Sequence, residues 1–228
     1  MELTAERGNS MTQTTFSNPV LDAVRRSLGR ESGAPLPPRQ LLPSARAAKP
    51  LQAEIALLLH ETEKVSGHTQ QLTEDNLDAA LWDLVQTENI RTATVWNTPT
   101  LQCLDITGRL KHLGVALVLP DADKHTLAQC DLGVTEADFA IPDSGTLGLL
   151  SGPEKPRAVS LLPAVHLALL TPAALRPDLH QVFAEAQHHG YLILITGPSR
   201  TADIELTLTL GVHGPRELYV WMLEQPGV

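Results

Sequence analysis

Hydrophobic positions along the chain alternate between helical spacing and short continuous runs. Helical spacing occurs from Leu51 onward, again after Thr73, and over 101–112 and 176–189. Continuous apolar or β-branched runs predict buried strands. These predicted strands cover residues 90–96, 115–119, 140–141, 147–150, 159–161, 165–170, 191–195 and 218–223. Because helices alternate with apolar strands, the pattern predicts an α/β fold with a mainly parallel sheet and helices on both faces.

The first 50 residues have a different pattern. Asn18-Pro19 and Gly29 bound a predicted short helix over 19–28, since proline is favoured at the first helical position and glycine just past the end. Five of the chain's 17 prolines then fall in residues 30–50, which predicts a linker. We therefore expect an N-terminal tail, helix and linker over 1–49 and one α/β domain over 50–228.

Charge and hydropathy exclude several classes of partner. The net charge of −9 is unfavourable for binding nucleic acid, which requires Lys and Arg to neutralise phosphates. No apolar run approaches the ~20 residues that cross a bilayer, so we expect no membrane span. The polar N-terminus lacks the apolar stretch of a secretory signal, so we expect a cytoplasmic protein.

Metal and cluster chemistry is also disfavoured. The only two cysteines, Cys103 and Cys130, lie outside any CxxC motif and are too few for a Cys-ligated cluster. No pair of histidines has zinc-ligand spacing. We expect no metal and no cofactor in this chain.

A turn of small residues follows the predicted strand at 140–141. Backbone N–H groups and hydroxyls around Ser144, Gly145 and Thr146 can converge on an anion. The alternative is a tight hairpin in which Asp143 forms an Asx-turn and Gly145 supplies a positive φ. Spacing alone favours the hairpin.

A second candidate segment follows the apolar strand at 191–195. Ligands bind at the carboxyl ends of strands in open parallel sheets, and this loop is expected there. Gly197 permits close approach of a ligand, Ser199 and Thr201 offer hydroxyls, and Arg200 offers a bidentate guanidinium. Asp203 is able to orient Arg200 or to act as an acid or base. The alternative is a capped loop with a local ion pair between Arg200 and Asp203.

Two histidines differ in their expected roles. His213 lies between Gly211 and Gly214 and is an acid–base candidate, although a histidine in a turn is more often a structural hydrogen-bond donor. His166 lies inside the apolar run 161–170, and we expect it to be a buried strand histidine.

Four segments together resemble the LUD domain, and specifically the lactate-utilisation protein C family. They are ADFAIPDSGTL (137–147), LLPAVHLALL (161–170), TGPSRTADIE (196–205) and GVHGP (211–215), and the resemblance covers roughly residues 50–225. It implies an α/β fold similar to the NagB/RpiA/CoA-transferase and 5-formyltetrahydrofolate cyclo-ligase group. Pro142 and Ser144 depart from the Ala and Thr more common in the family, and proline removes a backbone donor there.

The resemblance also implies a function. The family takes part in oxidising L-lactate to pyruvate beside two companion proteins that contain cysteine-rich and iron–sulfur motifs. The residues at family-motif positions are the site candidates. They are Ser144, Gly145, Thr146, Gly197, Ser199, Arg200, Thr201, Asp203, Glu205, His213 and Gly214.

Three hypotheses remain open at this stage. The first is a non-redox component of a lactate-oxidising assembly that binds a small anion between the loops at 144–146 and 197–201. The second is a stand-alone enzyme using a nucleotide or acyl-CoA, with Asp203 or Glu205 as base or nucleophile and His213 as an acid–base group. The third is a scaffold whose motifs only shape the fold. Whether the chain catalyses a step is left open.

Overall fold

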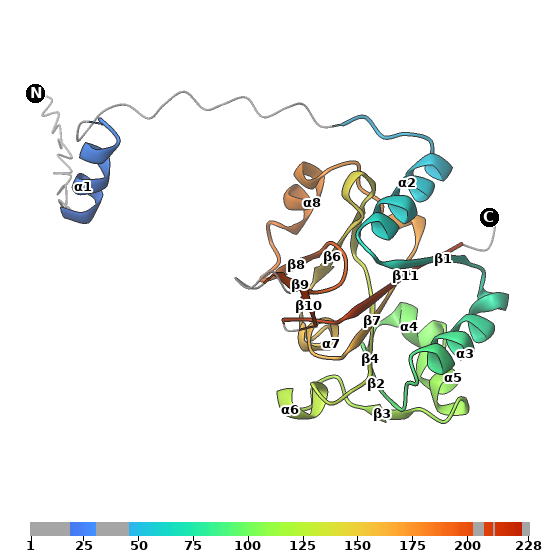
Figure 1. Cartoon of the computed structure of the whole chain (residues 1–228). Helices are drawn as coiled ribbons and strands as arrows, with labels where there is room; N and C mark the ends of the chain where they lie inside the picture. The colour runs from blue at the N-terminus through green and yellow to red at the C-terminus, as the bar shows by residue number, and fades with distance from the viewer. Residues whose placement is uncertain (1–18, 31–45, 203–207, 212, 225–228) are drawn as a thin grey trace, which may run out of the picture. The chain divides into compact units, whose positions relative to one another are not determined.

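A computed structural model describes residues 19–30, 46–202, 208–211 and 213–224 (Figure 1). The chain divides into two units, Met1–Pro43 and Ser44–Val228. In the first unit the described element is the predicted short helix, α1 (Pro19–Ser27), in which Arg25 and Asp22 form an ion pair of 3.1 Å. All candidate site residues lie in the second unit.

The second unit is built on a six-stranded parallel sheet with the order β1-β11-β7-β4-β2-β3 (Figure 1). The bounds of its strands are β1 His68–Leu72, β2 Thr92–Val95, β3 Ala116–Val118, β4 Leu132–Glu136, β7 Val165–Leu170 and β11 Glu217–Leu223. All six residues of β7 are buried, so both faces of the sheet are covered at its centre. The predicted α/β fold with a mainly parallel sheet is thereby confirmed.

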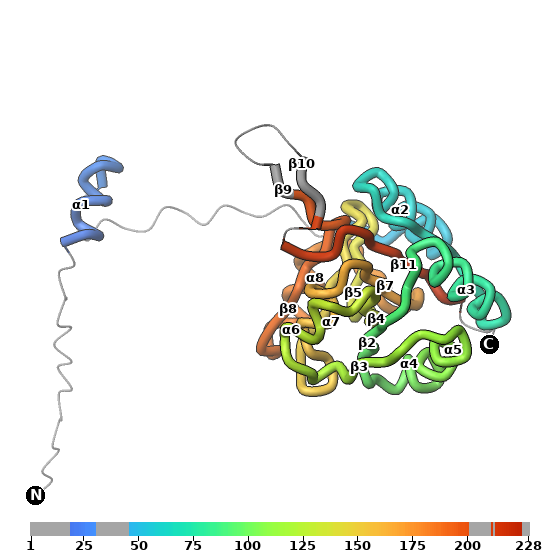
Figure 2. The backbone as a smooth tube through the Cα atoms, turned by 60° about the horizontal axis from the view of Figure 1, so that its bottom comes forward, coloured from blue at the N-terminus to red at the C-terminus, as the bar shows by residue number. Residues whose placement is uncertain are grey.

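Two smaller sheets accompany the main one. Antiparallel strands form the order β5-β6-β8, with β5 Phe139–Ile141, β6 Thr146–Leu150 and β8 Leu192–Ile195. A separate two-stranded ribbon consists of β9 (Arg200–Ala202) and β10 (Leu208–Leu210) (Figure 2). The most apolar predicted strand, 191–195, therefore belongs to an antiparallel sheet and not to the parallel one.

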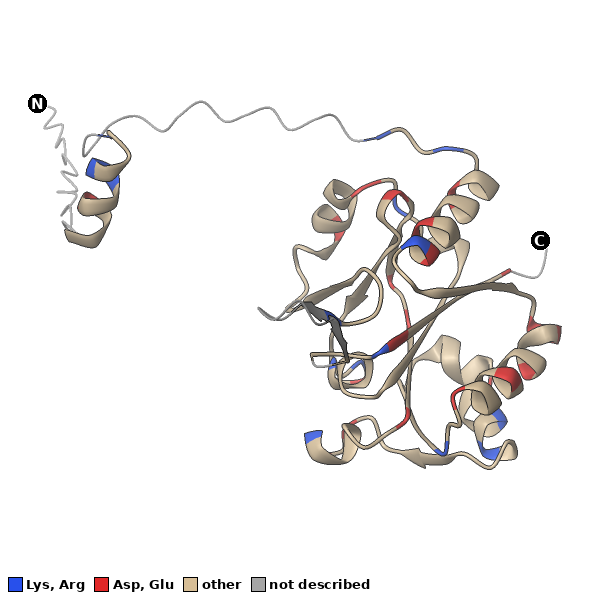
Figure 3. Ribbon diagram, in the orientation of Figure 1, with Lys and Arg blue, Asp and Glu red and all other residues tan. Residues whose placement is uncertain are grey.

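Helices connect the strands and cover the sheet. Their bounds are α2 Leu51–Lys64, α3 Leu77–Thr87, α4 Pro99–Cys103, α5 Ile106–His112, α6 Lys124–Leu127, α7 Ala158–Leu161 and α8 Leu179–Ala186, with 3-10 turns η1 Glu74–Asn76, η2 Pro142–Ser144 and η3 Pro172–Ala174. Figure 3 shows acidic positions along α3 beside basic positions of α5, and Asp78 and Arg109 form an ion pair of 2.5 Å between them. None of the helices in the described residues is long and apolar enough to cross a bilayer.

Two predicted elements differ from the structure. The predicted strand at 159–161 is wrong, because these residues form the short helix α7, whose Val159 carbonyl lies against Gly133 of β4. The predicted single helix over 101–112 divides at Asp105, which takes a left-handed conformation (φ 46°) and accepts a hydrogen bond from the Gly108 N–H as the N-cap of α5. The predicted strand at 159–161 rested on three residues, which are too few to distinguish a strand from a helical turn.

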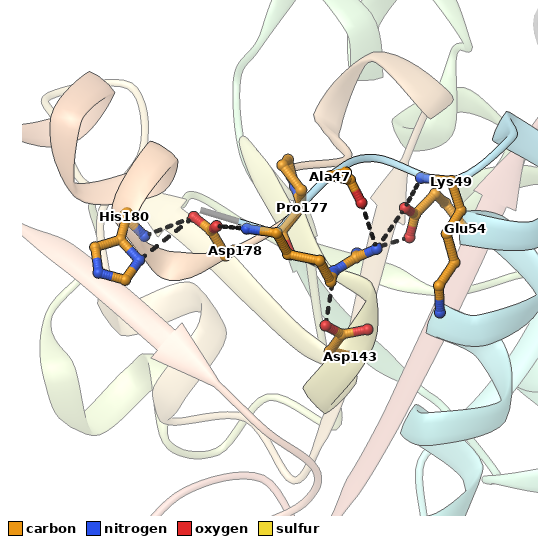
Figure 4. A network of polar contacts seen from close by, with 8 residues as sticks. Ala47, Lys49, Glu54, Asp143, Pro177, Asp178 and His180 are labelled. Atoms are coloured by element: carbon orange, nitrogen blue, oxygen red, sulfur yellow. Dashed lines mark hydrogen bonds and ion pairs between the residues drawn. The ribbon is translucent and has the colours of Figure 1, made fainter. Parts of the chain in front are cut away.

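Arg46 anchors the start of α2 to the rest of the unit (Figure 4). Its two terminal nitrogens donate to the two carboxylate oxygens of Glu54 at 2.8 and 2.9 Å, and Glu54 is buried. Its Nε lies 2.7 Å from Asp143 of η2, and its backbone N–H donates to Asp178, the N-cap of α8. Arg46 thus joins α2 and η2 through its side chain and the start of α8 through its backbone.

Candidate functional site

A cavity of about 280 Å³ lies at the amino ends of β7 and β11. Its walls include Leu161 of α7, Ile193 of β8, His166 of β7 and Leu218 of β11. Further wall comes from Ser160, the end of β8 and the segments 196–200 and 213–215. Three of the four segments singled out in the sequence, 161–170, 196–205 and 211–215, therefore meet at the cavity.

The prediction that the loop after 191–195 lies at the carboxyl end of a parallel strand is wrong. β8 runs antiparallel to β6, with Ile195 opposite Leu147, so its carboxyl end points toward the amino ends of β7 and β11. The N–H of Ser199 donates to the carbonyl of Pro215, two residues before β11, at 2.8 Å. The general rule for open parallel sheets does not apply to this loop.

Five predicted site residues line this cavity. They are Gly197, Ser199, Arg200, His213 and Gly214. Gly197 has φ +81° and a Cβ there would lie 2.8 Å from the Val65 carbonyl oxygen, so only glycine fits. A Cβ on Gly214 would lie 3.3 Å from the Cβ of Ser199, which brings the two loops into close contact.

The guanidinium of Arg200 is bound to the end of α2. Its Nη2 donates to the Val65 carbonyl at 3.1 Å and also contacts the Ser66 hydroxyl. A cation near the last carbonyls of a helix is favoured by the helix dipole. Arg200 is exposed and lines the cavity. The same side chain therefore caps the C-terminal end of α2 and offers positive charge to the cavity.

The predicted turn at 144–146 does not line the cavity but is connected to its wall through hydroxyl groups. Ser144 Oγ lies 2.7 Å from Thr146 Oγ1, which lies 2.7 Å from Thr196 Oγ1, and Thr196 lines the cavity. Gly145 has φ +60°, and a Cβ there would lie 2.6 Å from the Thr62 nitrogen of α2. Gly145 therefore has a packing role, while Thr146 connects the turn to the cavity wall.

His166 is the residue that the sequence analysis did not assign to the site. It is buried in β7 as expected, but it also lines the cavity. Its Nε2 lies 2.9 Å from Thr135 Oγ1, while its Nδ1 has no hydrogen-bond partner among the described residues. Burial lowers the pKa of His166 from 6.5 to about 3, so the imidazole is neutral. The available signal was a single histidine in an otherwise apolar strand.

Three candidates cannot be assessed in the same way. Asp203 and Glu205 lie outside the described residues, and for Thr201 only the backbone is described. The predicted ion pair between Arg200 and Asp203 therefore stays a prediction, as do the catalytic roles of Asp203 and Glu205.

A second polar cluster lies at the carboxyl ends of the parallel strands. Lys155 Nζ lies 2.6 Å from Asp138 and 3.3 Å from Glu136, and it stands over the ring of Trp96. Thr98 Oγ1 donates to Glu136 at 3.0 Å. Every charge in this cluster has a partner, and the cluster ties the Lys155 segment to the end of β4. Cavities of about 190 and 680 Å³ adjoin this edge.

No group of three or more His, Cys, Asp or Glu side chains in the described ranges is arranged to hold a metal ion. Cys103 is exposed, Cys130 is buried, and both are free thiols.

Comparison with known proteins identifies a matching domain family and two similar proteins that share one name. Residues 120–223 match the sequence profile of the LUD domain. The chain is 30% identical over 221 residues to lactate utilization protein C of Halalkalibacterium halodurans, covering 90% of this chain and 95% of that protein. It is 27% identical over 210 residues to lactate utilization protein C of Shouchella clausii, covering 86% and 92%.

A solved structure shares the fold. The crystal structure of a DUF162 family protein from Deinococcus radiodurans superposes with a TM-score of 0.56 at 16% identity, covering 77% of this chain and 99% of that chain. At this identity the match describes the architecture and not the ligand.

Proposed function

The chain belongs to the LUD-domain family, in its lactate utilization protein C group, and from this premise we propose that it serves lactate utilisation by binding a small carboxylate in the cavity described above. The observation that supports this most directly is the meeting of two motifs, Gly197–Arg200 and His213–Gly214, around one cavity of about 280 Å³. A three-carbon acid is small enough for such a cavity.

The chemistry of the cavity mouth favours an anion. Arg200 offers a permanent positive charge, and Ser199 and Thr196 offer hydroxyl groups beside it. The nearby chain of hydroxyls through Thr146 is able to reorient toward whichever group occupies the cavity.

Electron transfer in this proposal belongs to partner proteins. A chain with two cysteines does not supply the four thiolates of a Cys-ligated cluster. We therefore propose that iron–sulfur and cysteine-rich lactate-utilisation subunits act beside it in the cytoplasm, and that this chain is the non-redox component. Omitting each subunit in turn from lactate-dependent electron transfer tests this assignment.

The carboxylate site is tested by calorimetry with L-lactate and pyruvate. Arg200→Ala removes a charge-assisted hydrogen bond and is expected to weaken binding by ~1.5–3 kcal/mol. Ser66→Ala is the matched control, since it removes a hydroxyl that Arg200 contacts but leaves the guanidinium in place. Thermal unfolding of both variants separates loss of binding from loosening of α2.

Two results contradict the proposal. One is a wild-type chain that binds neither acid, alone or with its partners. The other is Arg200→Ala that stays folded and binds both acids as tightly as the wild type. Tight binding of ATP or CoA, with turnover lost in Asp203→Asn, favours instead the stand-alone enzyme.

A further inference from the structure

The closed side of the proposed carboxylate cavity contains a polar atom with no partner. His166 is 1% exposed, and its Nδ1 makes no hydrogen bond within the described residues. Buried polar groups in proteins are nearly always hydrogen-bonded, because an unpaired one loses its water without compensation. An imidazole with such an unpaired nitrogen needs a hydrogen-bond partner that the described residues do not supply.

The other buried polar side chain of the wall is different. Ser160 is fully buried and its hydroxyl donates to the Arg157 carbonyl at 3.0 Å. Its hydrogen-bonding need is met inside the protein. The hydroxyls of Thr62 and Thr94 are also buried without a partner, but among the residues that line this cavity the unpaired atom is Nδ1 of His166.

The cavity lining combines polar groups, including the neutral His166 and the cationic Arg200, with apolar side chains. Arg200 and His213 are exposed at the mouth, while Leu161, Ile193 and Leu218 contribute apolar wall. A ligand that satisfies this arrangement has an anionic end, a small apolar body and one uncharged hydrogen-bonding group.

The hydrogen bond between Thr135 and His166 allows the uncharged group of the ligand to be either a hydrogen-bond acceptor or a hydrogen-bond donor. Thr135 is fully buried, and its hydroxyl is able either to donate to Nε2 or to accept from it. If Thr135 donates, Nδ1 carries the proton and is a donor for a keto oxygen. If Thr135 accepts, Nδ1 is bare and accepts from a hydroxyl. Either state leaves the ring uncharged.

We propose that His166, set by Thr135, binds the 2-oxygen of a small 2-hydroxy or 2-oxo carboxylate whose carboxylate lies toward Arg200. This assignment rests on the proposed function, because it presupposes that the cavity holds a carboxylate. It adds the residue that selects for the 2-oxygen: both members of a hydroxy/oxo acid couple fit, whereas the same acid without the 2-oxygen lacks the contact. A low pKa keeps the ring neutral at physiological pH, which both binding modes require.

The discriminating experiment compares L-lactate and pyruvate with propionate. We expect the wild type to bind both oxygenated acids about tenfold or more tightly than propionate, the ratio for one good hydrogen bond. His166→Phe is expected to abolish this preference and leave propionate affinity unchanged, while His166→Gln restores part of it. Ser160→Ala is the matched control and keeps the full preference.

A second measurement follows His166 in the wild-type chain, and a variant is needed only to assign its resonance. In the wild-type chain with ¹⁵N-labelled histidine, lactate and pyruvate are expected to shift the ring nitrogens of His166, and propionate to leave them in place. The His166→Gln spectrum, or that of His166→Phe, identifies the resonance.

Each outcome has a separate meaning. If no carboxylate binds, the proposed function fails and this assignment with it. If all three acids bind equally and binding depends on Arg200, the carboxylate site stands and the role of His166 is overturned. A preference for the oxygenated acids that survives in folded His166→Phe, or an unshifted His166 resonance with lactate bound, also overturns it.

Discussion

At the scale of single residues, two glycines from different motifs have the same physical reason to be glycine. Gly145 and Gly197 both stand at family-motif positions, and both have a positive φ. In each case an added Cβ would meet backbone of the α2 segment at under 3 Å. Both motif glycines thus allow α2 to approach. Gly145 has the positive φ predicted for the hairpin, whereas the role predicted for Gly197 was to give a ligand space.

The first prediction concerns Gly145. Gly145→Ala is expected to destabilise the fold by ~2–4 kcal/mol, because it combines a left-handed backbone with a clash against Thr62 and Glu61 of α2. Gly114→Ala is the matched control: its φ is +81° but no atom lies within 4 Å of the added Cβ. That variant is expected to cost about 1 kcal/mol. Urea unfolding measures the loss of unfolding free energy in each variant. Equal losses would show that a Cβ at position 145 does not clash with α2.

At the scale of elements, the predicted helices and strands were mostly correct where the pattern was long. The run 165–170 and the run 218–223 became β7 and β11, neighbours in the sheet. The polar strand β1 was not predicted, because HTQQL has little hydrophobic pattern and lies at the sheet edge. It forms because its backbone pairs with β11.

The second prediction concerns the start of α2. Arg46→Ala removes both hydrogen bonds to the buried carboxylate of Glu54, and is expected to cost about 2–3 kcal/mol. Lys64→Ala, at the other end of α2, breaks an exposed ion pair with Glu61 and is expected to cost about 0.5 kcal/mol or less. Chemical denaturation compares the two. Similar small losses would mean that Arg46 does not anchor α2.

At the scale of the whole molecule, stability is expected to depend on pH through His166. Burial holds the pKa of His166 at about 3 in the folded chain, against 6.5 when unfolded. Between these values the unfolded chain binds a proton that the folded chain does not. The free energy of unfolding therefore falls as pH drops below about 6.5, by up to ~1.4 kcal/mol per pH unit.

Urea unfolding at pH 7.5, 6 and 5 tests this third prediction. The wild type is expected to weaken across the series, while His166→Gln, which does not titrate, loses most of that slope. The control His125→Gln alters an exposed histidine and keeps the wild-type slope. The hydrogen bond from Arg46 lowers the pKa of Glu54, so its contribution is present above about pH 4.5 and is lost only at lower pH. A wild-type curve that is flat from pH 7.5 to 5 contradicts the prediction.

The α/β class, the central strands and the identity of the motif residues follow from the amino-acid order alone, because these depend on local hydrophobic pattern and backbone preference. Which strands pair is known only from the folded chain. The run LILI of β8 is equally suited to a parallel or an antiparallel neighbour, and its pairing with β6 moved the Gly197–Arg200 loop to the amino ends of β7 and β11. The meeting of that loop with His166 is a non-local contact, for which no spacing along the chain provides a signal.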